Sequence, residues 1–325
     1  MEKGKKTIRH TLGLLVPQWL KRTLIHEMEL PGIPELSKRR DTIAHPLMPV
    51  VIFTRAYNRL EYTAQCIDSV ARQITKYPYI HIIVDQTSDD GTEQWFNWIH
   101  KINKPFWKNV GYIRLNKNIG DFGGMALGLA VVNNKYDRTM QLDNDCTLVS
   151  PHAIDNMNYA LDLLPPNSLV MCRRLGAGSA DGKTGGNVPL VKQSKAYNIK
   201  LLHGRSQLYK VNLAVASYLC SSKLLSQAVD AGCDATCKIC GSLTPRATSY
   251  KLHDVLSEHM QGWDGERFLQ HEKYYLGSVA LGMNYSRVSP AEILKDPTAL
   301  IEYTLGPQSD QDWFKPGLKI KSQKQ

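Results

Sequence analysis

Four apolar runs of strand length, each followed by polar residues, recur in the first half of the chain. The runs cover 47–54, 79–84, 110–115 and the residues that end at Leu142. Patterns of helical spacing lie between them, at 61–74, 93–102 and 123–133. Consecutive apolar positions, unlike alternating ones, are typical of strands buried on both faces. Because such strands alternate with helices, the pattern predicts a Rossmann-like α/β fold whose mostly parallel sheet carries helices on both faces.

Polar residues follow every one of these predicted strands. Thr54 to Arg59 follow the first, Asp85 the second, Asn118 the third, and Asp143 and Asp145 the fourth. In open parallel sheets, ligands bind outside the carboxyl ends of the strands, so we expect these residues to meet in one site. The chain has neither a phosphate-binding P-loop nor a G-x-G-x-x-G fingerprint at the expected place, which disfavours the common nucleotide-binding alternatives.

The triplet Asp143-Asn144-Asp145 is the strongest candidate for metal binding. Two carboxylates one residue apart can point into one cleft, and Mg²⁺ and Mn²⁺ prefer oxygen ligands. A single Asp-x-Asp triplet is more often a solvated turn. Its position after three other polar strand ends favours a divalent-metal site here.

Composition bounds the class of protein. A chain of 325 residues with 42% hydrophobic and 22% charged residues is globular, neither disordered nor fibrous. No apolar run reaches the ~18 residues that span a bilayer, and no secretory signal pattern is present. Seven cysteines in a chain of this size do not resemble a secreted disulfide framework. We therefore expect a soluble protein of a reducing cytoplasm.

The net charge of +10 lies mostly near the two ends of the sequence. Residues 1–40 hold nine Lys or Arg against four Glu, and residues 306–325 hold four Lys against two Asp. Such arms suit a polyanion, either nucleic acid or an anionic membrane surface, although solubility alone also explains them. We expect a basic extension and linker at 1–46, a first half of the main domain at 47–160, a second half with several cysteines at 161–305 and a basic tail at 306–325.

A cysteine cluster lies in the second half of the chain. Cys233, Cys237 and Cys240, with His253 or Cys220 as a fourth ligand, have spacings that suit a structural Zn²⁺ site. An iron–sulfur cluster of the radical-SAM type is disfavoured, because its cysteines follow the first strand of a barrel. Three unlinked cysteines explain the pattern equally well.

As a set, the strand-end motifs resemble those of family-2 glycosyltransferases of the GT-A fold. The matching segments are VVIFTRAYNR at 50–59, IIVDQTSDDGT at 82–92, LNKNIGDFGGMALGL at 115–129 and QLDNDC at 141–146. The resemblance covers about residues 47–160 and implies a nucleotide-sugar donor, a UDP-sugar first among them, bound with Mn²⁺ or Mg²⁺. Gln86 stands where the family often has a second acid, which leaves the choice of nucleotide open.

The resemblance also implies roles for single residues. The donor would contact the following strand-end residues: Thr54, Tyr57, Arg59, Asp85, Asn118, Gly120 and Asp143. Asp145, together with Asp143, would hold the metal ion. His271 is the histidine best placed by the resemblance to complete the metal site, with His253 and His259 as alternatives.

A late acidic segment supplies the candidates for the catalytic base. GWDGERF at 262–268 resembles the Trp-Gly-Gly-Glu-type motif of GT-A enzymes, so Asp264 and Glu266 are the first candidates and Glu272 the third. One carboxylate that takes the acceptor proton, with no second nucleophile, predicts a single inverting displacement. An acidic helix N-terminus explains one of these residues without catalysis.

The acceptor is the least determined part. The basic arms and the cysteine cluster favour a polyanion, and a hydroxymethylated base in DNA offers the required hydroxyl, as for some bacteriophage DNA-modifying glycosyltransferases acting in the host cytoplasm. Trp263 and Tyr250 are candidates for stacking on a flipped base. The alternatives are an enzyme that builds a bacterial surface polysaccharide or lipid-linked glycan, and a non-catalytic module that binds nucleotide-sugars or nucleic acid.

Overall fold

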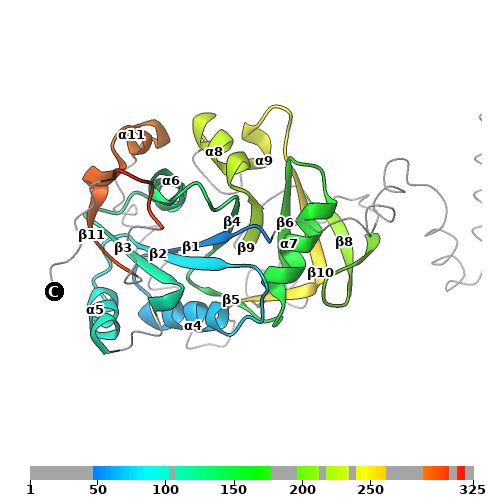
Figure 1. Cartoon of the computed structure of the whole chain (residues 1–325), viewed down its shortest axis with the longest axis horizontal. Helices are drawn as coiled ribbons and strands as arrows, with labels where there is room; N and C mark the ends of the chain where they lie inside the picture. The colour runs from blue at the N-terminus through cyan, green and yellow to red at the C-terminus, as the bar shows by residue number, and fades with distance from the viewer. Residues whose placement is uncertain are drawn as a thin grey trace, which may run out of the picture. The chain divides into compact units, whose positions relative to one another are not determined.

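The computed structural model describes seven segments of the chain: 47–102, 107–176, 196–211, 217–233, 239–260, 288–306 and 313–318. All of them belong to one compact unit, residues 47–325, that is distinct from residues 1–46. Within this unit a single sheet runs through both predicted halves (Figure 1).

The sheet has the strand order β11-β3-β2-β1-β4-β9-β6-β10-β8-β7, and β5 pairs with β10 beside this path. The strands are β1 Val50–Ala56, β2 Tyr79–Asp85, β3 Val110–Leu115, β4 Arg138–Leu142, β5 Cys146–Leu148, β6 Ser168–Gly176, β7 Ala196–Lys200, β8 Arg205–Val211, β9 Ser217–Ser221, β10 Thr248–His259 and β11 Ile301–Leu305. The four strands predicted from apolar runs are β1 to β4.

The central part of the sheet is parallel, as predicted. β1 pairs in parallel with β2 and β4, and β2 pairs in parallel with β3. These strands are buried along almost their whole length, which accounts for their consecutive apolar residues. On both sides of this group the neighbouring strands, β11 and β9, run antiparallel to it.

Helices cover both faces of the parallel strands, which confirms the predicted α/β architecture. Figure 1 shows α4 and α5 on one face and α6 and α8 on the other. The helices are α4 Leu60–Ala71, α5 Thr92–Ile102, α6 Asp121–Val131, α7 Ala153–Leu163, α8 Ser222–Asp230, α9 Ile239–Ser242 and α11 Pro290–Lys295, with a 3-10 turn at Pro297–Leu300.

A glycine allows α6 to lie close on the sheet. A Cβ atom at Gly128 would come within 2.4 Å of the Phe53 ring on β1, a distance that no side chain tolerates. The close packing fixes where α6 begins, at Asp121 just after the end of β3. The N-terminus of α6 is therefore held beside the carboxyl ends of the parallel strands.

The long strand β10 links the two parts of the sheet. It pairs in parallel with β6 and antiparallel with β8, and its register with β6 shifts between Leu252 and Leu256. Beyond this irregularity its last residues pair with β5, so that His259 lies opposite Cys146. The chain after residue 256 thus returns to the segment that follows β4.

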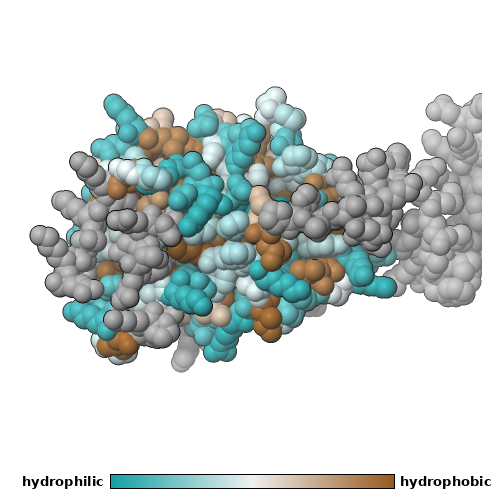
Figure 2. Space-filling view, viewed as in Figure 1, coloured by the Kyte–Doolittle hydropathy of each residue, from teal (hydrophilic) through white to brown (hydrophobic). Residues whose placement is uncertain are grey.

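The surface in the view of Figure 2 is mainly polar, with apolar residues in separate small patches. In the part of the chain that the structure describes, no helix is long and apolar enough to cross a membrane.

Candidate functional site

The loops that follow β1, β2, β3 and β4 are joined to one another by hydrogen bonds. The Asn58 amide donates to the Ser88 hydroxyl (2.8 Å), and Asn144 Nδ2 donates to the Asn58 carbonyl oxygen (3.2 Å). The Ile119 amide donates to Gln86 Oε1 (3.0 Å). These bonds connect four strand ends, as the sequence predicts, and we call the loops at 55–59, 85–90, 116–120 and 143–145 the rim.

Three residues of the rim have unusual backbone conformations. Asn58, Arg59 and Thr87 have φ values of 59°, 63° and 62°, in the left-handed region that residues other than glycine rarely adopt. Each such residue costs on the order of 1–3 kcal/mol and persists only where the surroundings hold it. The bonds of Asn58 to the neighbouring loops provide that support. Strain concentrated at the strand ends is typical of a functional site.

Both carboxylates of the Asp-x-Asp triplet form ion pairs with arginines of the first loop. Arg55 Nη2 contacts Asp143 Oδ1, which also accepts a hydrogen bond from Gln141 Nε2 (3.0 Å). Arg59 Nη1 lies 2.7 Å from Asp145 Oδ2. The side chain of Asp143 is 28% exposed and that of Asp145 is 6% exposed. The triplet therefore places two carboxylates at the rim, and the charge of each is balanced by an arginine.

A histidine from β10 completes this group. His259 Nε2 lies 3.5 Å from Asp145 Oδ1, and the Met260 amide donates to the Asp145 carbonyl oxygen (2.8 Å). Asp145, Cys146 and His259 each present a ligand atom within 4.8 Å of the others. Burial first, and the nearby aspartates second, raise the pKa of the Cys146 thiol well above its usual value.

The donor set therefore fits a hard divalent cation. The Asp145 carboxylate and the His259 imidazole lie together with the Cys146 thiol, and Asp143 offers a second carboxylate after the same strand. Carboxylate oxygens are ligands that Mn²⁺ and Mg²⁺ prefer. His259 was one of the alternatives for the metal-binding histidine. The preferred candidate, His271, lies outside the described residues.

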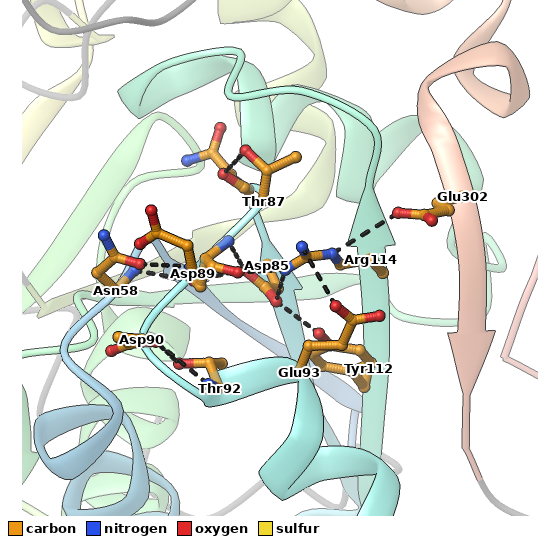
Figure 3. Close-up of polar contacts among 12 residues, drawn as sticks. Asn58, Asp85, Thr87, Asp89, Asp90, Thr92, Glu93, Tyr112, Arg114 and Glu302 are labelled. Carbon is orange, nitrogen blue, oxygen red and sulfur yellow. Dashed lines mark hydrogen bonds and ion pairs between the residues drawn. The ribbon is translucent and has the colours of Figure 1, made fainter.

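Asp85 differs from the triplet because the protein satisfies it completely. Its Oδ1 accepts bonds from the Ser88 amide (2.9 Å) and hydroxyl (2.6 Å), and its Oδ2 accepts bonds from the Tyr112 hydroxyl (2.5 Å) and Arg114 Nη1 (2.6 Å). The residue is fully buried. Figure 3 shows Asp85 enclosed by these groups. All four contacts of the carboxylate are made within the protein, so in this structure Asp85 holds the rim together, and its contact with a base or ribose stays a prediction.

Arg114 extends this network to two further acids. It lies 3.4 Å from Glu93 on α5 and 3.7 Å from Glu302 on β11 (Figure 3). Burial and the neighbouring Asp85 raise the pKa of Tyr112, so the phenol remains a donor to that carboxylate. The network joins β2, β3, α5 and β11 behind the rim.

The other predicted donor-binding residues lie at different depths. Thr54 is fully buried, and its hydroxyl lies 2.8 Å from His81 Nε2, beneath the rim. Tyr57 is partly exposed on the first loop. Asn118 Oδ1 accepts a bond from the Gly120 amide (2.9 Å), and Gly120, with φ 84°, leads into α6. Successive strand residues face opposite sides, so Arg55, which the motif comparison missed, points to the rim side while Thr54 does not.

The predicted catalytic carboxylates Asp264, Glu266 and Glu272 lie outside the described residues, as do Trp263 and Cys237. Tyr250, the second stacking candidate, is partly buried against the hydrophobic core.

Of the described candidates for the predicted zinc site, Cys220, Cys233 and Cys240 belong to one hydrophobic core cluster, whereas His253 lies beside Arg173. Cys233 and Cys240 are buried in the hydrophobic core, and the Cys240 thiol lies 2.9 Å from the Ser249 hydroxyl. His253 Nε2 lies 3.2 Å from Arg173 Nη1. The groups of close metal-ligating side chains found among the described residues include none of these four. With Cys237 outside the described segments, the zinc site stays a prediction.

Part of the sequence matches a known protein family. Residues 51–201 match the sequence profile of the family described as "Glycosyl transferase family 2". No curated protein sequence matches the chain. The match supports a family 2 glycosyltransferase domain in residues 51–201 and agrees with the predicted enzyme class.

Solved structures with a similar backbone have low sequence identity to the chain. S. aureus TarS 1–349 in complex with UDP-GlcNAc is 15% identical, with a TM-score of 0.47, over 76% of this chain and 70% of that one. The mannosyltransferase PcManGT from Pyrobaculum calidifontis in complex with GDP-Man and Mn²⁺ is 14% identical, with a TM-score of 0.47, over 82% and 76%. A longer chain of S. aureus TarS also matches, and this chain spans only 41% of the length of that protein.

Proposed function

Taking the family 2 domain as the premise, we propose that the chain is a metal-dependent, inverting glycosyltransferase. It moves a sugar from a nucleotide-sugar, with UDP-sugars first among the candidates, to an acceptor hydroxyl. The observation that carries this proposal is the arrangement of Asp143, Asp145 and His259 at a rim that four strand ends build together. This arrangement lies where ligands bind to sheets of this class.

In this proposal Asp143, Asp145 and His259 hold a Mn²⁺ or Mg²⁺ ion. The ion supplies positive charge that stabilises the leaving diphosphate. Arg55 and Arg59, now paired with the two carboxylates, provide further positive charge at the same place. The buried network of Asp85 and Arg114 keeps the loops of the rim in position, so that these groups are organised before the donor arrives.

The donor part of the proposal is tested with a panel of UDP-, GDP- and dTDP-sugars. Purified protein is incubated with each donor, with Mn²⁺ or with a chelator, and the released nucleotide is measured. We expect release from at least one donor in Mn²⁺, none in the chelator, and none from Asp145→Ala that keeps its fold. A wild-type protein that neither binds nor turns over any donor favours the alternative of a non-catalytic binding module that recognises other ligands.

The inverting mechanism is proposed because the sequence offers one carboxylate region for the catalytic base, at 262–272, and no candidate for a second nucleophile. Asp264 or Glu266, with Glu272 third, takes the proton of the acceptor hydroxyl. Glu266→Gln and Asp264→Asn should then differ, because only the base loses most of the rate while the donor still binds. Assignment of the product anomer by NMR decides the stereochemistry, and a retained configuration refutes the mechanism.

For the acceptor we propose a hydroxymethylated base in DNA. The support is the excess of positive charge in residues 1–40 and 306–325, which suits a polyanion. The test compares transfer of labelled sugar to hydroxymethylated and to unmodified duplex DNA, and follows DNA binding as salt increases. Binding carried by phosphate contacts weakens steeply with salt. Transfer to a lipid-linked or oligosaccharide acceptor, with none to DNA, establishes the enzyme of surface polysaccharide or lipid-linked glycan instead.

A further inference from the structure

A second group of metal-ligating side chains shares no residue with the rim. His152 lies directly before α7, Asp155 lies in the first turn of that helix, and His203 lies in the turn between β7 and β8. A spacing of three residues at a helix start places His152 and Asp155 on the same side. The ligand atoms of the three side chains all lie within 4.8 Å of one another.

The contacts within this cluster are close. His203 Nε2 lies 2.8 Å from Asp155 Oδ2. The rings of His152 and His203 stack with centroids 3.9 Å apart and 15° between their planes. The Asp155 side chain is 1% exposed and that of His203 is 30% exposed, so a buried carboxylate faces an imidazole that solvent reaches.

Groups outside the cluster orient two of the three ligands. His152 Nδ1 lies 2.9 Å from the Ile74 carbonyl oxygen, which can only accept, so Nδ1 carries the proton and Nε2 keeps its lone pair. Asp155 Oδ1 accepts bonds from the Thr75 hydroxyl (2.6 Å) and the Lys76 amide (2.9 Å), which leaves Oδ2 to face the histidines. Metal-binding histidines and carboxylates characteristically have such outer partners.

The backbone at His203 is held as well. Its amide donates to Asn156 Oδ1 (2.9 Å), and Asn156 Nδ2 donates to the His203 carbonyl oxygen (3.1 Å). The turn is closed by a bond from the Leu201 amide to the Gly204 carbonyl oxygen (3.0 Å). The backbone at His203 is therefore fixed relative to α7 through Asn156.

We propose that His152, Asp155 and His203 bind a transition-metal ion of the zinc class. Two imidazoles and one carboxylate suit Zn²⁺, Co²⁺ or Ni²⁺, whereas Mg²⁺ and Ca²⁺ prefer oxygen ligands alone. With the proton of the neutral His203 ring on Nδ1, the Nε2 lone pair would face the ion in place of its contact with Asp155, and water would complete the coordination. The ion ties the β7–β8 hairpin and the start of α7 to residues 74–76. This site does not depend on the proposed sugar transfer.

The test uses Co²⁺, whose visible absorption reports coordination, in full-length Asp145→Ala protein, so that the rim does not contribute. We expect one Co²⁺ per chain, displaced by Zn²⁺. Adding either His152→Ala or His203→Ala should weaken binding by roughly 10-fold or more, in line with the loss of a single ligand. Adding His100→Ala, a histidine of α5 that belongs to neither of the predicted metal sites, should leave the affinity unchanged.

Two controls keep the test decisive. His152→Ala leaves the Asp155–His203 contact in place, so a loss of Co²⁺ binding in that variant is not explained by a loosened hairpin. The thermal midpoint of Asp145→Ala should rise with Zn²⁺ and should not rise when His203→Ala is added. The site is refuted if Asp145→Ala binds no Co²⁺, or if both added histidine variants bind Co²⁺ as tightly as Asp145→Ala does.

Discussion

Two acidic sites lie at the carboxyl ends of β2 and β4, the strands on either side of β1, and differ in how completely the protein satisfies them. Asp85, at the end of β2, is fully buried and accepts four hydrogen bonds from Ser88, Tyr112 and Arg114. Asp143, just after β4, keeps 28% of its side chain exposed beside Arg55. The first carboxylate is part of the framework, while the second is in a position to exchange its partner for a ligand.

The difference has an energetic reason. A buried ion pair is tolerated only where further hydrogen bonds satisfy the remaining positions of both charges, as Tyr112 and Ser88 do for Asp85. The partly exposed pair of Arg55 and Asp143 is weaker, because water reaches the Asp143 carboxylate and competes for it. Two aspartates at the same edge of the sheet therefore differ in role: Asp85 stabilises the loops, and Asp143 is available to a ligand.

The largest effect is expected for Asp145→Asn. If Asp145 holds the metal ion, sugar transfer or donor hydrolysis should fall by roughly 10³-fold or more, since the ion contributes several kcal/mol to the transition state. The change keeps the size of the side chain but removes the charge that pairs with Arg59, so the urea midpoint should fall as well. Steady-state turnover and urea unfolding measure the two effects. Equal turnover in wild type and variant contradicts a metal-binding role for Asp145.

Asp85→Asn should instead act on stability. Removing the charge of Asp85 leaves Arg114 with only its longer contacts to Glu93 and Glu302, which should cost up to about 3–5 kcal/mol. Tyr112→Phe is the matched control: it removes one of the four donors and should cost about 1 kcal/mol. Urea unfolding compares the two variants. A variant Asp85→Asn of normal stability that binds nucleotide poorly would show that Asp85 contacts the donor, as the family resemblance implied.

His81, beneath the rim, should make stability depend on pH. Burial lowers the pKa of His81 from 6.5 to about 3, so the unfolded chain binds a proton there that the folded chain does not. Stability therefore rises with pH between these values, and wild type should lose at most about 2 kcal/mol from pH 7 to pH 5 through this residue. His81→Leu should lack this contribution. Urea unfolding at both pH values measures it, and an identical pH dependence in the variant excludes His81 as the source.

The smallest effect is expected for Arg55→Gln. Arg55 and a metal ion compete for Asp143, so without nucleotide the variant should bind Mn²⁺ a few-fold more tightly than wild type. With Mn²⁺ present it should bind UDP more weakly, because one cation near the diphosphate is lost. Arg72→Gln, at a surface arginine that pairs with Asp68, serves as the control and should change neither affinity. Calorimetric titration measures both. An unchanged Mn²⁺ affinity shows that the arginine does not compete.

The parallel centre of the fold was predictable because its signal is local. Each of β1 to β4 is buried on both faces, so consecutive apolar residues mark the strand and the polar residue after them marks its end. The antiparallel strands beyond β4 gave no such signal. The pairing of β10 with β6, β8 and β5 joins residues up to about a hundred positions apart, and only tertiary contacts determine it.

The two aspartates of the candidate metal site were predictable because their signal is also local. Asp143 and Asp145 follow a strand directly, and the resemblance located them. Arg55 was missed although alternation along β1 places it opposite Thr54, and Tyr112 and Arg114 share a face by the same rule. The choice of His259 among the histidines had no local signal, because the register between β10 and β5 brings it to Asp145. Assigning alternate residues of each strand to opposite faces of the sheet would have identified Arg55 and Arg114 but not His259.

The most direct test of the rim as a metal and donor site is the binding of Mn²⁺ followed by electron paramagnetic resonance as UDP is added. The account predicts that wild type binds one Mn²⁺ per chain in the presence of UDP and that Asp145→Asn, equally folded, leaves the ion in solution. Loss of the free Mn²⁺ signal to the same extent in both proteins, or in neither, would contradict the assignment of Asp145 and its neighbours as the metal site.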